Sequence, residues 1–228
     1  MATPPIYLNE ADHQRISAAV AAAESRSAGE IVTILADRSD GYTDVAMVWS
    51  ALAAFLALCA LTIAPDFYLG LYDQLTGGWV QNWHPREVFA VAAIVASLKF
   101  GGMMILQMWQ PLKFWLVLPA IKHARVRDRA VRAFRIGAER RTHGRTGILI
   151  YISIREKRAE IVADEAIATI VSPEVWGDAM IAMLGEIRQG RIADGLIAGV
   201  DHVGAVLAEH FPRPVDDINE LPDRLIEV

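Results

Sequence analysis

The sequence predicts a mixed α/β domain that is interrupted by a two-helix transmembrane hairpin. Two uncharged apolar stretches, at residues 45–64 and 88–109, lie in the middle of the 228-residue chain, and only Lys99 breaks the second. A helix of roughly 20 apolar residues, at ~1.5 Å per residue, spans the ~30 Å hydrocarbon core of a bilayer. Short β-branched runs and helical apolar spacings stand on both sides of these stretches. The flanks therefore read as foldable α/β sequence and the centre as membrane sequence.

The elements before the membrane stretches cannot form a domain by themselves. Asn9 is placed to cap a helix that Gly29 ends, and the apolar side of this helix carries Ile16, Ala19, Val20 and Ala23. Residues 31–35 then form a continuous β-branched run, which is typical of a strand buried on both faces. One helix and one strand cannot bury that strand. We expect its partners to come from the sequence after residue 109.

The second half supplies those partners. Residues 121–141 predict a basic helix, and residues 147–153 and 159–163 predict two strands that a charged turn at 155–158 joins as a hairpin. Ser172 and Pro173 predict the start of another helix, and a last helix follows Gly190. We therefore expect residues 6–41 and 121–211 to form one discontinuous domain. Residues 42–120 form the hairpin with an interfacial connector at 110–121, and residues 212–228 an acidic, loosely held tail.

Charge asymmetry predicts the topology. Between residues 113 and 145 lie ten lysines and arginines but only two acidic residues, whereas the connection 65–87 carries the single basic residue Arg86. Lys- and Arg-rich short loops remain cytoplasmic. Residues 1–38 also lack the apolar core of a secretory signal peptide. We expect both termini in the cytoplasm, at a bacterial-type inner membrane.

The basic helix has two interpretations. Its residues Lys122, Arg125, Arg129 and Arg132 can attract anionic lipid headgroups at the membrane surface, at about 1 kcal/mol for each nearby charge. Alternatively, they form a site for a phosphorylated substrate or an acidic partner. Lys99 also has two interpretations, either an ion or proton pathway or a side chain that snorkels to the membrane surface.

Several segments resemble the TPM-domain family, in its bacterial form with a membrane hairpin inserted in the domain. They are AAESRSAGEIV at 22–32, TGILIYIS at 146–153, AEIVAD at 159–164 and GRIADGLIAGV at 190–200. The resemblance implies an α/β/α sandwich with a small mixed sheet. Some members are linked to turnover of photosynthetic membrane complexes or to ion channels, and acid phosphatase activity and calcium binding are attributed to some plant members. Most such domains lie outside the cytoplasm, which differs from the orientation predicted here.

One constellation of acidic residues is a candidate site. Asp37 follows the first predicted strand, and Asp164 and Glu165 follow the third. Ligands of open α/β sheets bind at the carboxyl ends of strands, so adjacent ends could hold Ca²⁺ or Mg²⁺ with carboxylate oxygens. Helix capping and surface solvation are the structural alternative. The six histidines are scattered, and Cys59 is the single cysteine, so the sequence offers no histidine or cysteine metal cluster.

These observations favour one function and leave a second open. The chain has no phosphate-binding glycine loop, nucleophile elbow or zinc-protease motif, and its net charge of −5 excludes nucleic acid as an evident partner. We expect an accessory or interaction module at the membrane, whose partners are the lipid bilayer and other membrane proteins. The alternative is a metal-dependent, phosphatase-like hydrolase that uses the three acidic residues.

Overall fold

The computed structural model describes residues 7–77, 83–137, 146–172, 174–214 and 223–228. Two compact units make up the chain. Met1–Asp40 and Pro119–Val228 form the first, called the α/β unit below, and Gly41–Leu118 form the second, called the hairpin unit. The first unit is thus assembled from two segments that are separated in sequence by the whole of the second.

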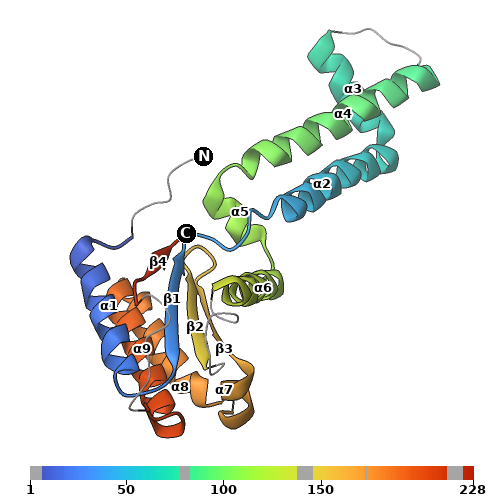
Figure 1. The fold of residues 1–228 in the computed structure, drawn as a ribbon. Helices are drawn as coiled ribbons and strands as arrows, with labels where there is room; N and C mark the ends of the chain where they lie inside the picture. The colour runs from blue at the N-terminus through green and yellow to red at the C-terminus, as the bar shows by residue number, and fades with distance from the viewer. Residues whose placement is uncertain (1–6, 78–82, 138–145, 173, 215–222) are drawn as a thin grey trace. The chain divides into compact units, whose positions relative to one another are not determined.

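A small mixed sheet forms the centre of the α/β unit (Figure 1). Its strands are β1 (Glu30–Ala36), β2 (Gly147–Ser153), β3 (Arg158–Ala163) and β4 (Ile226–Glu227), in the order β3-β2-β1-β4. Strand β1 is parallel to both β2 and β4, and β2 is antiparallel to β3. The three longer strands agree with the predicted ones within one residue at each end. All seven residues of β1 and of β2 are buried, as their unbroken apolar sequences predict.

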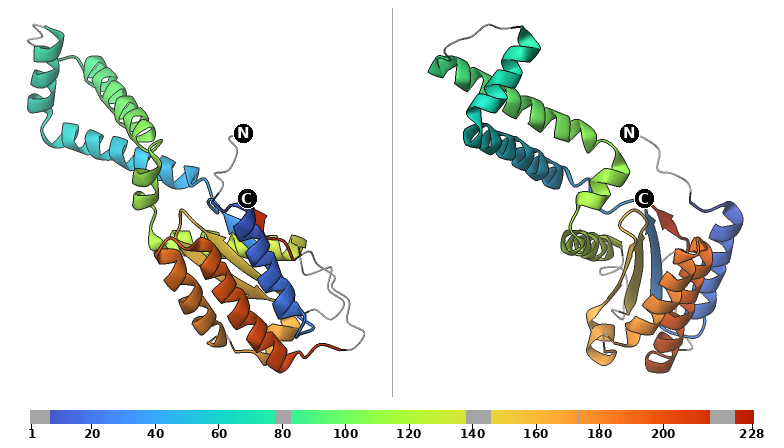
Figure 2. Two further views of the ribbon diagram at one scale, coloured as in Figure 1. Left: turned by 90° about the vertical axis from the view of Figure 1, so that its left-hand side faces the viewer. Right: turned by 180° about the vertical axis from the view of Figure 1, so that it is seen from behind.

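Helices cover both faces of this sheet, which gives the expected α/β/α sandwich (Figures 1 and 2). One face carries α1 (Glu10–Glu24), α8 (Val175–Arg188) and α9 (Ile192–His210), and the other carries α6 (Pro119–Gly137). The larger core lies between the sheet and the three-helix layer, where Ile16, Ile150 and Leu196 are fully buried. The smaller core joins β1 and β2 to Val126, Ala130 and Phe134 of α6.

At the two ends of α1, one local sequence signal predicts the helix boundary correctly and the other does not. The start is as predicted, because the Asn9 side chain accepts from the Asp12 N–H at 2.9 Å and the Asp12 carboxylate faces the Asn9 N–H. The end is not at Gly29, because the helix stops at Glu24. Gly29 has a different role: a Cβ there would lie 2.8 Å from Leu207 Cδ1. It allows the chain to pass close to α9.

Three short elements were not predicted. Helix α7 (Glu165–Ile170) follows β3, α3 (Pro65–Thr76) lies in the connection between the apolar stretches, and β4 pairs with β1. The last residues are therefore part of the sheet, and the expectation of a loosely held tail was wrong at Ile226–Glu227. Helix α8 begins at Val175 with Glu174 at its N-cap, so Ser172 does not cap it, and Pro173 lies outside the described residues.

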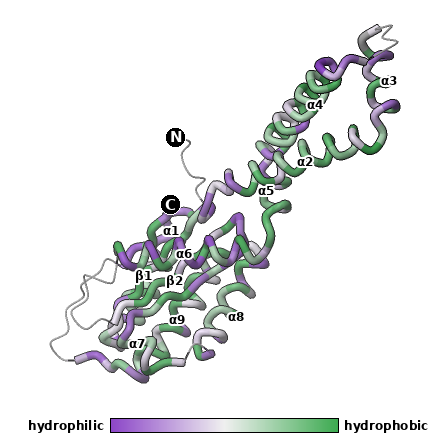
Figure 3. The backbone as a smooth tube through the Cα atoms, turned by 90° about the vertical axis from the view of Figure 1, so that its right-hand side faces the viewer, coloured by the Kyte–Doolittle hydropathy of each residue, from purple (hydrophilic) through white to green (hydrophobic). Residues whose placement is uncertain are grey.

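The hairpin unit is built from the predicted apolar stretches. Helices α2 (Thr43–Ile63) and α4 (Pro85–Leu106) pack side by side, and both are long and apolar enough to cross a membrane. Hydrophobic residues predominate in both helices (Figure 3). Leu61, Leu69 and Val91 form a small core among α2, α3 and α4. Helix α5 (Gln110–Leu116) occupies the predicted connector, which ends where Pro119 opens α6.

Candidate functional site

The three acidic residues predicted to share a metal ion do not meet. Asp37 follows the carboxyl end of β1, where its backbone lies beside Arg155. Strand β3 runs in the opposite direction, and the Asp164 N–H donates to the Gly147 carbonyl at the start of β2, 2.9 Å away. At ~3.3 Å per residue, the seven-residue strands separate these two ends by roughly 20 Å. A metal site of Asp37, Asp164 and Glu165 therefore does not form.

The structural alternative accounts for two of these acids. The buried Asp164 is the N-cap of α7, and its Oδ1 accepts from the Glu165 N–H at 2.9 Å. Glu165 is exposed in the first turn of the same helix. In the described part of the chain, no group of three histidine, cysteine or acidic residues is arranged to hold a metal ion.

Asp37 is held in a clamp of side chains. The Arg155 Nε donates to both carboxylate oxygens at 2.9 Å, and the Tyr7 hydroxyl donates to Oδ1. Burial alone would raise the pKa of Asp37, but the hydrogen bonds from Tyr7 and Arg155 outweigh it and hold that pKa below its usual value. Burial and the same contact raise the pKa of Tyr7 to about 12. The clamp fastens the N-terminal segment to the β2–β3 turn.

A second buried cluster lies beside this clamp. The Glu156 carboxylate accepts from the Ser39 N–H at 3.0 Å and from the Ser153 hydroxyl, and the Ser39 and Tyr151 hydroxyls are 3.1 Å apart. Burial raises the pKa of Tyr151. Because these contacts join the segment after β1 to β2 and the β2–β3 turn, they fix the point where the chain leaves the α/β unit for α2.

The four basic residues of α6 that the sequence analysis singled out divide into two pairs. Their spacings of three, four and three residues place Lys122, Arg125, Arg129 and Arg132 along one side of the helix. Burial lowers the pKa of the half-buried Lys122, and the nearby Glu156 charge opposes this shift. Arg125 Nε lies 3.3 Å from Asp40 Oδ2. Arg129 and Arg132 are exposed. Neither forms an ion pair with a carboxylate of the described residues.

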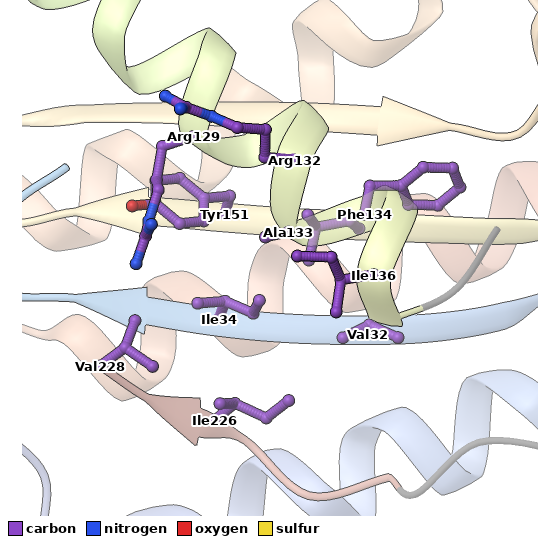
Figure 4. A pocket seen from close by; sticks show the side chains of 11 residues that line it. Val32, Ile34, Arg129, Arg132, Ala133, Phe134, Ile136, Tyr151, Ile226 and Val228 are labelled. Carbon is purple, nitrogen blue, oxygen red and sulfur yellow. The ribbon is translucent and has the colours of Figure 1, made fainter.

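Arg129 and Arg132 stand at one end of an apolar pocket between α6 and the sheet (Figure 4). Its volume is about 280 Å³. The Arg129 side chain extends beside the Tyr151 ring toward β1 and β4. Apolar side chains from the sheet and from α6 form the rest of the lining: Val32, Ile34, Ala133, Phe134, Ile136, Leu149, Ile226 and Val228. The sequence analysis did not predict this pocket. The one available signal was the spacing of the arginines next to the apolar side of the same helix.

Comparison with known proteins shows what the α/β part of the chain resembles. Residues 115–206, from the end of α5 into α9, match the family model of the TPM domain. This segment of the chain is therefore similar to a TPM domain. The NMR structure of the BA42 protein from the psychrophilic bacterium Bizionia argentinensis has a similar fold, with a TM-score of 0.57 and 19% sequence identity over 100% of each chain. At that identity the likeness concerns the fold alone. No curated protein matches the sequence.

Proposed function

We propose that this chain is a membrane-anchored TPM-domain protein that acts as an accessory or interaction module at the inner membrane. The observation that carries the proposal is the exposed apolar surface of the hairpin unit. Ile63 is 83% exposed and Leu98 is 69% exposed, and large apolar side chains are exposed along both α2 and α4. Scattered exposed apolar residues are ordinary, but a continuous apolar surface needs lipid or protein to cover it.

The dimensions and the flanks of the hairpin suit a bilayer. With 21 and 22 residues, α2 and α4 extend about 32 Å, close to the ~30 Å hydrocarbon core. Aromatic residues cluster beside both ends, with Phe67 and Tyr68 on α3 and Trp109 and Trp115 at α5. Amphipathic aromatic rings favour the membrane–water interface. These features support α3 and α5 as interfacial helices on opposite sides of the membrane.

The polar groups within the hairpin are few and mostly satisfied. The buried Gln107 side chain donates to the Ala46 carbonyl at 3.0 Å and lies 3.3 Å from the Ser50 hydroxyl, so it joins α4 to α2. Lys99 is exposed, about seven residues from the end of α4, which is within reach of the interface for a snorkelling lysine. Both arrangements favour a membrane anchor over a transport path through two helices.

The charge distribution supports a cytoplasmic α/β unit. Arg86 is the single basic residue in the connection 65–87, whereas α6 and the segment after it are rich in arginine. In this orientation, both segments of the TPM domain stay on the side where they are synthesised. The alternative of a phosphatase that uses Asp37, Asp164 and Glu165 has no supporting arrangement, because these side chains lie at two ends of the sheet.

Three measurements test the proposal. After alkaline carbonate extraction the protein should remain in the membrane pellet, and release into the supernatant would contradict anchoring. Reporter fusions at Gly77 and after Val228 should give opposite signals, and matching signals would overturn the topology. A pull-down from detergent extract should recover the same membrane proteins in replicate experiments. Failure to recover any reproducible partner would contradict the role as an interaction module.

A further inference from the structure

We propose that the pocket between α6 and the sheet binds a single-chain anionic amphiphile. The anionic head would lie between the guanidinium groups of Arg129 and Arg132, and the apolar chain would lie over β1 and β4. This inference goes beyond the proposed function, since it concerns the α/β unit by itself and does not require the membrane anchor.

The apolar part of the pocket results from unequal covering of the two sheet faces. In the described structure, one face carries α1, α8 and α9, whereas the other carries α6, which packs mainly on β3 and β2. Among the described residues, the α6 face of β1 and β4 is therefore incompletely covered. It contributes Val32 and Ile34 to the floor, and Ile226, which is 37% exposed, to the edge. Apolar surface of this kind favours an apolar chain over water.

The charged end of the pocket determines the sign of the charge that a ligand must carry. The Arg132 Nε donates to the Asp128 carbonyl at 3.1 Å. The two terminal nitrogens of this guanidinium group are left to bind a ligand. Arg129 lies beside the Tyr151 hydroxyl. Two guanidinium groups without a carboxylate partner in the described residues, in a chain of net charge −5, form a local excess of positive charge. Planar guanidinium groups suit carboxylate and phosphate heads, which they bind with paired hydrogen bonds.

The size of the pocket limits the rest of the ligand. A volume of about 280 Å³ is at the lower end of the ~300–1,000 Å³ that small-molecule pockets provide. This space suits one medium-length alkyl chain rather than the two long chains of a membrane phospholipid. The combination of one apolar chain and one anionic head distinguishes the proposed ligand from a free anion and from a neutral lipid.

Photolabelling of the full chain in nanodiscs of zwitterionic phosphatidylcholine tests the proposal. The probe is decanoate with a terminal diazirine, and labelled positions are mapped by peptide mass spectrometry. We expect saturable labelling in the peptides that contain Ile136 and Ile226. Decanoate and decyl phosphate should compete, and the stronger of the two identifies the head group. Decanol, acetate and inorganic phosphate should not compete at the same concentrations, because each lacks one half of the ligand.

Variants separate a real site from general adsorption. Arg129→Gln with Arg132→Gln should raise the concentration for half-maximal labelling at least about tenfold, since the charge-assisted hydrogen bonds to the anionic head are lost. Arg127→Gln with Arg188→Gln removes the same charge outside this pocket. This control should change the concentration for half-maximal labelling by less than about twofold. Ile226→Glu places a carboxylate at the partly exposed apolar edge of the pocket and should also weaken labelling. Circular dichroism and thermal unfolding of each variant establish that it is folded.

Three results would overturn the inference. Equal competition by acetate or inorganic phosphate would mean a site for simple anions, and equal competition by decanol would mean an apolar cleft that does not recognise charge. Labelling that is unchanged in the folded Arg129/Arg132 double variant, or that is spread over α2 and α4 without enrichment at the pocket, would exclude the site. None of these results bears on whether the hairpin anchors the chain, which carbonate extraction measures separately.

Discussion

The two units of this protein use apolar residues in opposite ways. In the α/β unit, β1 and β2 are buried along their whole length, and the neighbouring helices direct Ile16, Leu196 and Val200 inward. In the hairpin unit, α2 and α4 expose most of their large apolar side chains, and the buried core is confined to a few contacts such as Leu61 and Val91. The first pattern is typical of a unit with its own buried core, and the second is the pattern that the proposed membrane anchor requires. Two units of one chain can therefore place similar apolar residues on opposite sides of their surfaces.

The largest expected effect comes from truncating matched isoleucines in the two units. Ile150→Ala in β2 removes a fully buried side chain and should destabilise the α/β unit by about 2–5 kcal/mol. Ile105→Ala on α4 removes a mostly exposed side chain and should change unfolding by less than about 0.5 kcal/mol. Denaturant unfolding of the purified protein measures both. Similar losses at both positions would break the contrast between the units.

A smaller effect is expected where helices approach closely in the α/β unit. A Cβ at Gly204 of α9 would lie 2.6 Å from the Ala23 Cβ of α1, so Gly204→Ala should cost about 1–3 kcal/mol by forcing the helices apart. A Cβ at Gly185 of α8 would meet no neighbouring atom within 4 Å, so Gly185→Ala should stabilise by about 0.5–1 kcal/mol. Thermal unfolding should shift in opposite directions for these two variants, and a shift in the same direction would refute the packing argument.

The α/β unit also contains a carboxyl group that should make its stability depend on pH. Burial raises the pKa of Glu24 to about 8, opposed by the hydrogen bond from the Ile31 N–H and reinforced by the charges of Glu30 and Asp223. The unfolded chain releases this proton near pH 4.5, so stability should fall as pH rises from about 4.5 to 8. After allowance for solvent screening, the change should be on the order of 1 kcal/mol.

Glu24→Gln tests this assignment, because glutamine keeps the acceptor oxygen but does not titrate. The decline in stability between pH 5 and pH 8 should become shallower in the variant than in the parent. Glu10→Gln, at an exposed position in the first turn of the same helix, serves as the control. An identical pH profile for Glu24→Gln and the parent would exclude Glu24 as the titrating group.

The smallest effect is expected inside the hairpin. Gln107→Leu removes the hydrogen bonds between α4 and α2, and such bonds contribute about 0.6 kcal/mol on average in membrane proteins. The variant should remain in the membrane and lose little stability in detergent. A loss as large as that of Ile150→Ala would show that a polar contact, rather than apolar surface, holds this unit together.

Local sequence patterns were sufficient to predict most of the helices and strands of the α/β unit. The strand at residues 147–153, the Asn9 cap and the apolar side of the last helix each depend on a few neighbouring residues, and the structure has all three. Helix α7 and strand β4 were missed because they span six and two residues, too few for a periodic pattern to develop.

The candidate site was harder to predict, because its geometry depends on strand direction and on contacts between residues that are distant in sequence. The turn at residues 155–158 already predicted that the third strand is antiparallel to the second, and this places Asp164 at the opposite end of the sheet from Asp37. The pairings of Asp37 with Arg155 and of Arg125 with Asp40 join residues more than 80 positions apart, so sequence spacing did not reveal them. The pocket arises because the described helices cover one sheet face incompletely, and this is a property of the assembled layers.

The most direct test of the central claim uses cysteine accessibility. Cys59 is the single cysteine and lies in α2. In intact cells it should not react with a membrane-impermeant maleimide. In a Cys59→Ala background, Gly77→Cys should react from outside, and Glu209→Cys in α9 should react only after the membrane is permeabilised. Labelling of Gly77→Cys and Glu209→Cys on the same side, or ready labelling of Cys59, would contradict a membrane hairpin inserted in a cytoplasmic TPM domain.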